Sequence, residues 1–266
     1  MTGDVAAAAG GCHLFSGCGF PAPGLQDFNF QKLFSIGGWN VTKPEVLAIL
    51  VTLVVIVFFW VAFAKPKMIP GKTQSIGEMA ILAVRDQVIR PQLGAKGDKY
   101  LAYISAMFFW ILLCNLIELV PILQFPVMSR IGFVLPMMLI MYVLYWYQGF
   151  KTKGFIGYFR SWIPQVPLFV LPLLILIEVA KYVIIQPFTL AIRLFANMFA
   201  GHLLLSIFMV ATWYLAGASI GLVYAAGSLF MVFFVFLLEI LVGLLQAFIF
   251  TTLISSYLAD SLEYHH

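Results

Sequence analysis

The feature that most constrains this 266-residue chain is a run of 78 residues, Tyr182–Ala259, with only three Asp, Glu, Lys, Arg or His side chains. The three are Arg193, His202 and Glu239. An arginine at the centre of a bilayer costs about 3 to 17 kcal/mol, and its guanidinium cannot avoid that cost by losing a proton. A chain that keeps an arginine in such a run is expected to use it against another charge.

Composition places the chain in a membrane. Hydrophobic residues make up 63% of it and charged residues 10%, whereas soluble domains carry about 25% charged residues. We therefore predict an all-α integral membrane protein. The net charge of +4 is mild and follows the loops, so we do not expect a nucleic-acid partner.

Apolar segments long enough for helical spans predict about five membrane crossings. The predicted spans are 46–64, 100–123, 131–150, 167–216 and 222–258. Residues 75–90 mix apolar and charged side chains, and they start with the capping-box pattern Ser75–Glu78. We predict that they form a helix along the membrane surface, ended by Pro91.

The N-terminal residues 1–44 are rich in Gly, Pro and Ala and predict an irregular tail, and 45–266 form the predicted membrane domain. The first ten residues lack a basic region and an apolar core, so we expect no signal peptide. If the tail is exported, Cys12 and Cys18 either form a disulfide or remain free thiols.

Lysine and arginine placement predicts the orientation. Loops 65–99 and 151–160 together carry ten of them, whereas the tail and the 124–130 loop carry three. The first group is expected in the cytoplasm. The N-terminus is then outside, and after five crossings the C-terminus is cytoplasmic.

The last two spans are too long to stand upright. They hold 50 and 37 residues, or about 75 and 55 Å of helix, against a hydrocarbon core of about 30 Å. Pro172 and Pro187 permit kinks. We predict a long, tilted hairpin.

Folding this hairpin at residues 219–221 brings together residues whose numbers sum to about 440. Arg193 then faces Gln246, and His202 faces Glu239. Asn197 follows Arg193 by one helical turn, on the same face. Spacing alone therefore predicts two polar levels inside the hairpin.

Each ionisable side chain has a functional and a structural interpretation. Arg193 either faces an acidic partner or extends to an interface. His202 and Glu239 form either a proton relay or a buried pair that ties two helices together. Glu118, one turn after Asn115, either lines an aqueous path or lies among lipid headgroups.

Further along, Glu178 and Lys181 are spaced to pair on one helix face, either as a channel mouth or as a neutralising ion pair. Gln246 either binds Arg193 or contacts a neighbouring helix. The sequence has no Cys/His spacing typical of a metal site and no nucleotide-binding motif, so we expect no metal or cofactor.

Two segments resemble the signatures of subunit a of F-type ATP synthases. One is Pro187-Phe-Thr-Leu-Ala-Ile-Arg193-Leu-Phe-Ala-Asn197-Met-Phe-Ala-Gly-His202, and the other begins at Glu239-Ile-Leu-Val-Gly-Leu-Leu-Gln246. Their separation also resembles that of the family. The resemblance covers most of the chain after residue 45.

The resemblance implies a non-catalytic stator subunit in a bacterial inner membrane. Its implied partners are the ring of c subunits, b-type peripheral stalk subunits, other ATP synthase subunits, membrane lipid and protons. Two aqueous half-channels would lead to a carboxylate on the ring, and Arg193 would separate them. Flow through them would couple proton movement to rotation and ATP synthesis.

By the same resemblance, His202 and Glu239 lie in the outer half-channel and Glu178 in the inner one, with Asn197 and Gln246 near the arginine. Many members carry the acid first and the histidine later, and this chain reverses the order. The alternatives are a self-contained secondary transporter, a membrane enzyme using His202 and Glu239 as acid and base, and a structural anchor that leaves Arg193 unexplained.

Overall fold

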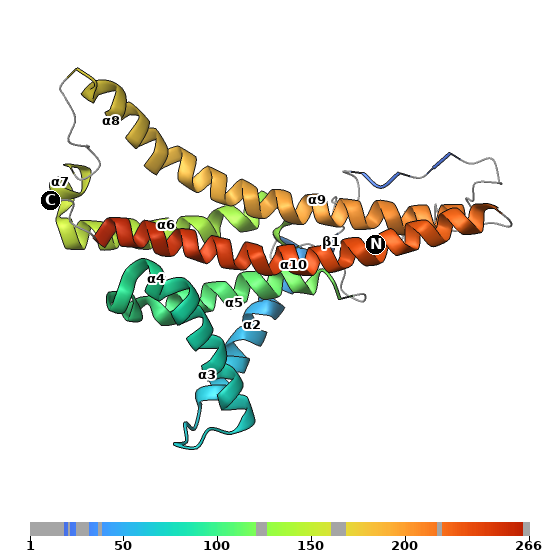
Figure 1. Cartoon of the computed structure of the whole chain (residues 1–266), viewed down its shortest axis with the longest axis horizontal. Coiled ribbons are helices and arrows are strands. Elements are labelled where there is room, and N and C mark those ends of the chain that lie inside the picture. Colours follow the sequence, from blue (N-terminus) through green and yellow to red (C-terminus); the bar gives the residue numbers. More distant parts are fainter. Residues whose placement is uncertain are drawn as a thin grey trace. The chain divides into compact units, whose positions relative to one another are not determined.

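A computed structural model describes residues 19–20, 22–24, 32–36, 39–120, 127–160, 169–216 and 220–262. Within these residues five helical segments are long and apolar enough to cross a membrane (Figure 1). They are Lys43–Phe63, Lys72–Ile117, Ile131–Lys153, Leu171–Leu215 and Gly221–Leu262. The all-α integral membrane fold is confirmed. Cys12, Cys18 and residues 217–219, at the start of the predicted bend, lie outside the described residues.

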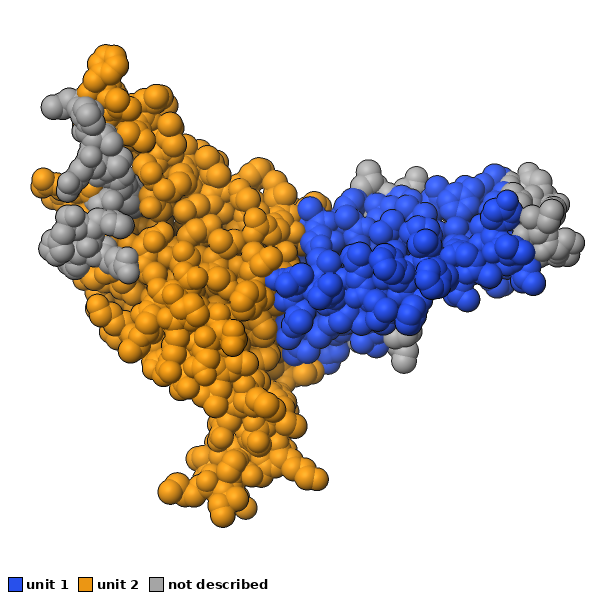
Figure 2. All heavy atoms as spheres, viewed as in Figure 1, with its two compact units in different colours: residues 1–53, 112–129, 196–245 blue, residues 54–111, 130–195, 246–266 orange. Residues whose placement is uncertain are grey.

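The chain divides into two compact units, which Figure 2 shows in different colours. The first unit comprises residues 1–53, 112–129 and 196–245. The second unit comprises residues 54–111, 130–195 and 246–266. Both units are assembled from distant parts of the sequence, because long helices contribute residues to each.

The first unit contains a short hairpin within residues that the sequence predicted to be an irregular tail. Strand β1, Lys32–Ile36, pairs antiparallel with β2, Trp39–Thr42. Ile36 pairs with Trp39, so two residues connect the strands. In the sequence these are Gly37 and Gly38, a pair that favours tight hairpin turns.

Helix α2, Lys43–Phe63, follows the hairpin directly. The backbone N–H of Thr42 donates a hydrogen bond to Oε2 of Glu45 at 2.7 Å. This is one half of a capping box, the half in which an acid in the first turn reaches back to the residue before the helix. Thr42–Glu45 therefore marks the start of the first span.

Helices α9, Gln186–Leu215, and α10, Ile220–Leu262, run antiparallel where they contact within the first unit (Figure 1). Gly201 of α9 lies against Glu239 of α10, which confirms the predicted register at that level. Eleven residues before Glu239 on α10, the Ser228 hydroxyl donates at 2.9 Å to the carbonyl oxygen of Phe208, which lies seven residues after Gly201 on α9. The two helices thus stay in register along the hairpin.

The segment after α2 is one helical stretch that continues past Pro91, where the sequence predicted the helix to end. It begins at Lys72, three residues before the predicted capping box, and runs to Ile117. Its parts are α3 (Lys72–Val84), the π-helix η3 (Arg85–Ile89), α4 (Arg90–Leu93), the 3₁₀ helix η4 (Gly94–Tyr100) and α5 (Leu101–Ile117). Gly94, at φ 59°, makes the turn that lets the chain change direction.

Two prolines explain the positions of the π-helices, in which the helix is wider than an α-helix. Pro91 comes two residues after η3, and Pro187 comes two residues after the π-helix η6, Lys181–Ile185. A proline cannot donate to the carbonyl four residues earlier and its ring crowds that oxygen. The chain responds with five-residue hydrogen bonds, from Arg90 N–H to the Arg85 carbonyl and from Gln186 N–H to the Lys181 carbonyl. The helix therefore continues past each proline.

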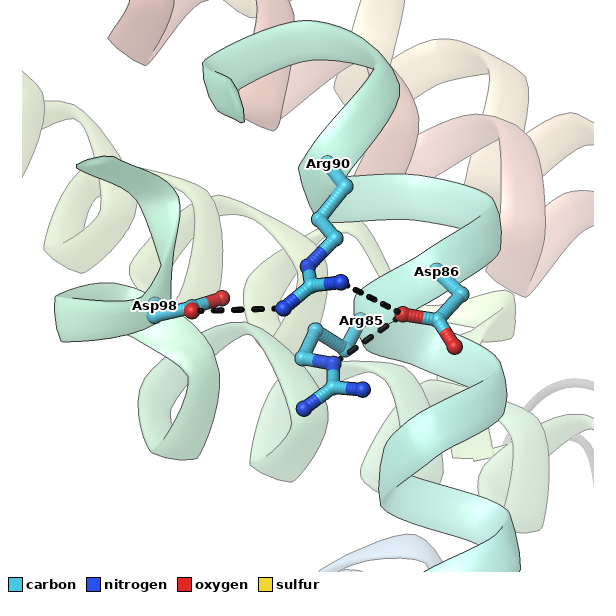
Figure 3. A network of polar contacts seen from close by, with 4 residues as sticks. All are labelled: Arg85, Asp86, Arg90 and Asp98. Carbon is cyan, nitrogen blue, oxygen red and sulfur yellow. Dashed lines mark hydrogen bonds and ion pairs between the residues drawn. The ribbon is translucent and has the colours of Figure 1, made fainter. Parts of the chain in front are cut away.

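The turn at η3 and η4 is held by an apolar core and an exposed ion network. Val84, Val88, Ile89 and Ile104 are buried together. On the outside, Arg90 lies between Asp86 and Asp98, at 3.8 and 3.7 Å, and Arg85 is 3.0 Å from Asp86 (Figure 3). Because Asp86, Arg90 and Asp98 are about half exposed and Arg85 about a quarter, each pair is worth at most about 1 kcal/mol.

The remaining elements are η5 (Val127–Ser129), α6 (Ile131–Lys153), α7 (Phe155–Arg160) and α8 (Leu171–Ala180). Pro172 lies in the first turn of α8, where a missing N–H removes no helix hydrogen bond. Segment Leu171–Leu215 has 45 residues and Gly221–Leu262 has 42. Each exceeds the roughly 20 residues of an upright span, as the sequence predicted.

Candidate functional site

A cavity of about 200 Å³ lies within the first unit. Residues from the end of α5, from α9 and from α10 line it. Its polar lining residues are Asn115, Glu118, Asn197 and Glu239. Four polar side chains around one space between apolar helices are the environment in which water and protons can be held.

His202 pairs with Glu118 in the first unit, whereas the sequence predicted a pair with Glu239. Its Nδ1 lies 3.1 Å from Oε1 of Glu118. Glu118 is buried, at 4% exposure. The register of the hairpin holds, but the sequence could not show that the turn directly after α5 supplies the nearer acid. Glu118 is thus the partner of the imidazole as well as part of the cavity wall.

Glu239 faces the same cavity from α10. Among the described residues, neither of its carboxylate oxygens has a hydrogen-bond partner. A Cβ atom added to Gly201 would lie 2.6 Å from Glu239 Oε1. Gly201 is therefore the residue that leaves room for the acid. Glu118 lines the same cavity and His202 is paired with Glu118, so two acids and an imidazole lie close together.

Asn115 connects α5 to α10 at the edge of this cavity. It is 4% exposed, and its Nδ2 donates to the Gly243 carbonyl oxygen at 3.0 Å. A Cβ on Gly243 would lie 3.2 Å from the Asn115 Cβ. Close approach at Gly243 therefore allows α5 to bring Asn115 and Glu118 to the hairpin.

Arg193 lies on α9 in the second unit and its side chain is exposed. It forms no ion pair with any acid in the described part of the chain. Gln246, its predicted partner, is buried at 5% exposure, and its Nε2 has no partner among the described residues. No hydrogen bond between Arg193 and Gln246 is seen there.

Glu178 and Lys181 form the pair expected from their spacing. Lys181 Nζ lies 2.6 Å from Glu178 Oε2. The lysine ammonium also lies 4.5 Å from the centre of the Tyr182 ring, in a cation–π contact. The pair stands in α8 and η6, at the widened stretch before Pro187.

Several tyrosines of the second unit were missed as polar residues of interest. Tyr142 and Tyr145 lie three residues apart on α6 and pack together with Tyr158, Tyr182 and Tyr257. The spacing on α6 was the one signal for them, since aromatic residues three apart share a helix face. In the described residues, no group of three or more His, Cys, Asp or Glu could hold a metal ion.

Comparison with known proteins gives consistent matches over nearly the whole chain. The family described as "ATP synthase A chain" matches residues 46–259. "ATP synthase subunit a" of Streptomyces lividans is 40% identical over 260 residues, covering 96% of this chain and 92% of that protein. "ATP synthase subunit a" of Frankia alni is 35% identical over 253 residues, covering 92% of this chain and 87% of that protein. The Nocardioides sp. protein of that name is 35% identical over 267 residues, covering 94% and 96%.

Proposed function

Because this chain belongs to the ATP synthase subunit a family, we propose that it is the proton-translocating stator subunit of the Fo sector. Two aqueous half-channels reach a carboxylate on the rotating c ring, and Arg193 separates them. The chain performs no catalysis itself. It couples proton flow to rotation, and the rotation drives ATP synthesis elsewhere in the complex.

One observation carries this proposal: Arg193 is exposed on an apolar helix and has no acidic partner in the described part of the chain. A permanent charge at that place favours the ionised form of an acid brought to it from outside. It also repels a proton or hydronium that would pass directly between the half-channels. A lysine would serve less well, because it can lose its proton when buried.

The cavity of the first unit supports an outer half-channel. Glu118, His202 and Glu239 can each accept and release a proton, and Asn115 and Asn197 can hold water beside them. Histidine and carboxylate exchange protons readily because their ordinary pKa values lie within about 2 to 3 units of each other. We propose that protons pass along these three side chains to the ring.

Glu178 is proposed for the inner half-channel, with Lys181 holding its carboxylate in place. Gln246 and Asn197 are proposed to contact the ring near the arginine. The proposed orientation places the N-terminus outside a bacterial inner membrane and the C-terminus in the cytoplasm, as the distribution of basic residues favours. The c ring, the b-type peripheral stalk, other ATP synthase subunits and lipid surround the chain.

The test replaces Arg193 in the assembled ATP synthase and measures ATP-driven proton pumping in membrane vesicles. Arg193→Ala is expected to abolish coupled pumping while the complex still assembles, and Arg193→Lys is expected to retain only a small part of it. Gln92→Ala, which changes a partly exposed polar side chain in α4, is the control. Normal pumping by Arg193→Ala in an assembled complex would overturn the proposal.

A further inference from the structure

Five tyrosines of the second unit gather at one place from four helical segments. Tyr142 and Tyr145 come from α6, Tyr158 from α7, Tyr182 from η6 and Tyr257 from α10. Tyr145 and Tyr158 are buried, and the other three pack against them. These five residues are called the tyrosine cluster below. Phenylalanine would fill the same space in a lipid-facing protein without a polar atom, so the hydroxyl groups require an explanation.

The rings contact one another edge to face, which leaves the cluster dense but rich in oxygen atoms. The ring centres of Tyr142 and Tyr145 are 5.6 Å apart, and those of Tyr145 and Tyr158 are 6.3 Å apart. The Tyr142 hydroxyl donates to Oε1 of Gln186 at 3.3 Å, at the start of α9. A phenol can donate one hydrogen bond and accept another at once.

The tyrosine cluster extends between charged groups of the second unit. Tyr142 donates to Gln186, which lies seven residues before Arg193 on α9 and therefore on the same face of that helix. Tyr182 lies beneath the Lys181 ammonium, which is paired with Glu178. Tyr142, Tyr182 and Tyr257 all pack against the buried Tyr145 and Tyr158. The phenols therefore make a continuous set of neighbours from the arginine-bearing face of α9 to the ion pair.

We propose that the tyrosine cluster lines the inner half-channel and that its hydroxyl groups, with water, carry protons between Arg193 and the Glu178–Lys181 pair. The inference rests on the proposed function and extends it to residues not assigned there. In each transfer a phenol oxygen accepts the incoming proton while its own proton moves to the next acceptor. Every phenol therefore ends the transfer neutral, and one proton has moved along the path.

Phenols suit this place because of the arginine. A carboxylate beside Arg193 would form a lasting ion pair with it and cancel the charge that the ring carboxylate must meet. A phenol stays neutral near pH 7, since its ordinary pKa is about 10. It can therefore relay a proton next to the guanidinium without competing for it.

The test uses Tyr142→Phe, Tyr257→Phe and the double variant in the assembled ATP synthase. Phenylalanine keeps each ring and removes only the oxygen. We expect passive proton flux through Fo to fall about 10-fold or more in the double variant, with a larger solvent deuterium isotope effect. Tyr147→Phe is the matched control, because Tyr147 is on the same helix and 57% exposed, and its flux should not change.

Unchanged flux in the double variant would overturn the relay. If the double variant does not assemble, Tyr257→Cys gives an independent answer through modification by a charged, water-borne thiol reagent on inverted vesicles. Modification that blocks flux supports an aqueous path, and no modification overturns it. Arg193→Ala is run in parallel: if it loses pumping while the tyrosine variants keep normal flux, the relay fails and the stator proposal stands.

Discussion

The cavity of the first unit and the tyrosine cluster of the second collect polar groups by opposite means. Glu118 and Glu239 line a cavity of about 200 Å³, and His202 pairs with Glu118 at its wall. The phenols of the tyrosine cluster pack ring against ring, with Tyr158 only 1% exposed. Acids and imidazole change charge between about pH 4 and 7, whereas phenols do not.

The contrast between the cavity and the tyrosine cluster shows what surroundings a titrating group and a neutral hydroxyl group each need. A group that becomes charged inside apolar helices needs water or an opposite charge beside it. The first unit provides both, with the cavity and the His202–Glu118 pair. A neutral hydroxyl needs one hydrogen-bond partner and can otherwise be packed as an aromatic ring.

The largest effect is expected at Glu118, because it is both the imidazole partner and part of the cavity wall. Glu118→Gln keeps the shape and removes the charge. Passive proton flux through the assembled Fo should fall about 100-fold, the scale of one acid–base group. Flux within a factor of 2 of the native complex would mean that the first-unit cavity is not a proton path.

A double-mutant cycle sharpens the same point. Glu118→Gln and His202→Ala remove two members of one pair. The effect of the double variant on flux, expressed as a free energy, should therefore be smaller than the sum of the two single effects by more than about 1 kcal/mol. His202→Ala with Asn115→Ala, which removes the contact to Gly243 instead, is the comparison. Additive effects of Glu118 and His202 would show that the 3.1 Å contact does not matter for transport.

Next in size is Gly201→Ala, which places a methyl group where the Glu239 carboxylate lies, 2.6 Å from Oε1. The carboxylate must move, at about 1 to 3 kcal/mol for a small-to-large change, and flux should fall about 10-fold. Shortening the acid in Gly201→Ala/Glu239→Asp should restore part of it. Gly227→Ala, on α10 with open space at its Cβ position, is the control.

In the second unit Gly149→Ala tests how closely the tyrosine cluster is packed. The new methyl group would collide with the Tyr158 ring, so we expect a loss of about 1 to 3 kcal/mol of stability. Thermal denaturation of the purified complex would detect this loss of stability, because the subunit would dissociate or unfold at a lower temperature. Gly132→Ala, on the same α6 helix with nothing near its Cβ position, should cause no loss. Equal stability of the two variants would mean that the cluster is loosely packed.

The smallest change in stability within the second unit is expected in the exposed ion network of Figure 3. Asp86→Asn removes one acid whose contacts with Arg85 and Arg90 are at 3.0 and 3.8 Å and about half exposed. Stability should change by less than about 1 kcal/mol, less still at high salt. A loss as large as that of Gly149→Ala would show that this network is shielded by another subunit.

Much of the fold could be predicted because a helix that crosses a bilayer needs about 20 apolar residues or more. The five spans and the excess length of the last two follow from apolar runs that any membrane helix needs. The continuation of helix past Pro91 was not predicted, because a π-helix can take up a proline where neighbouring packing supports it. The hairpin at residues 32–42 was missed although Gly37 and Gly38 are its signal.

By itself the sequence determined that this chain carries Arg193, His202 and Glu239 within apolar helices, and that α9 and α10 meet near Gly201 and Glu239. Helical periodicity fixes such facing positions along a hairpin once the bend is known. Only the tertiary structure decided that α5 brings Glu118 to His202 and that five tyrosines from four segments meet. Those contacts join residues far apart in sequence, and they depend on how several helices pack, which no local pattern encodes.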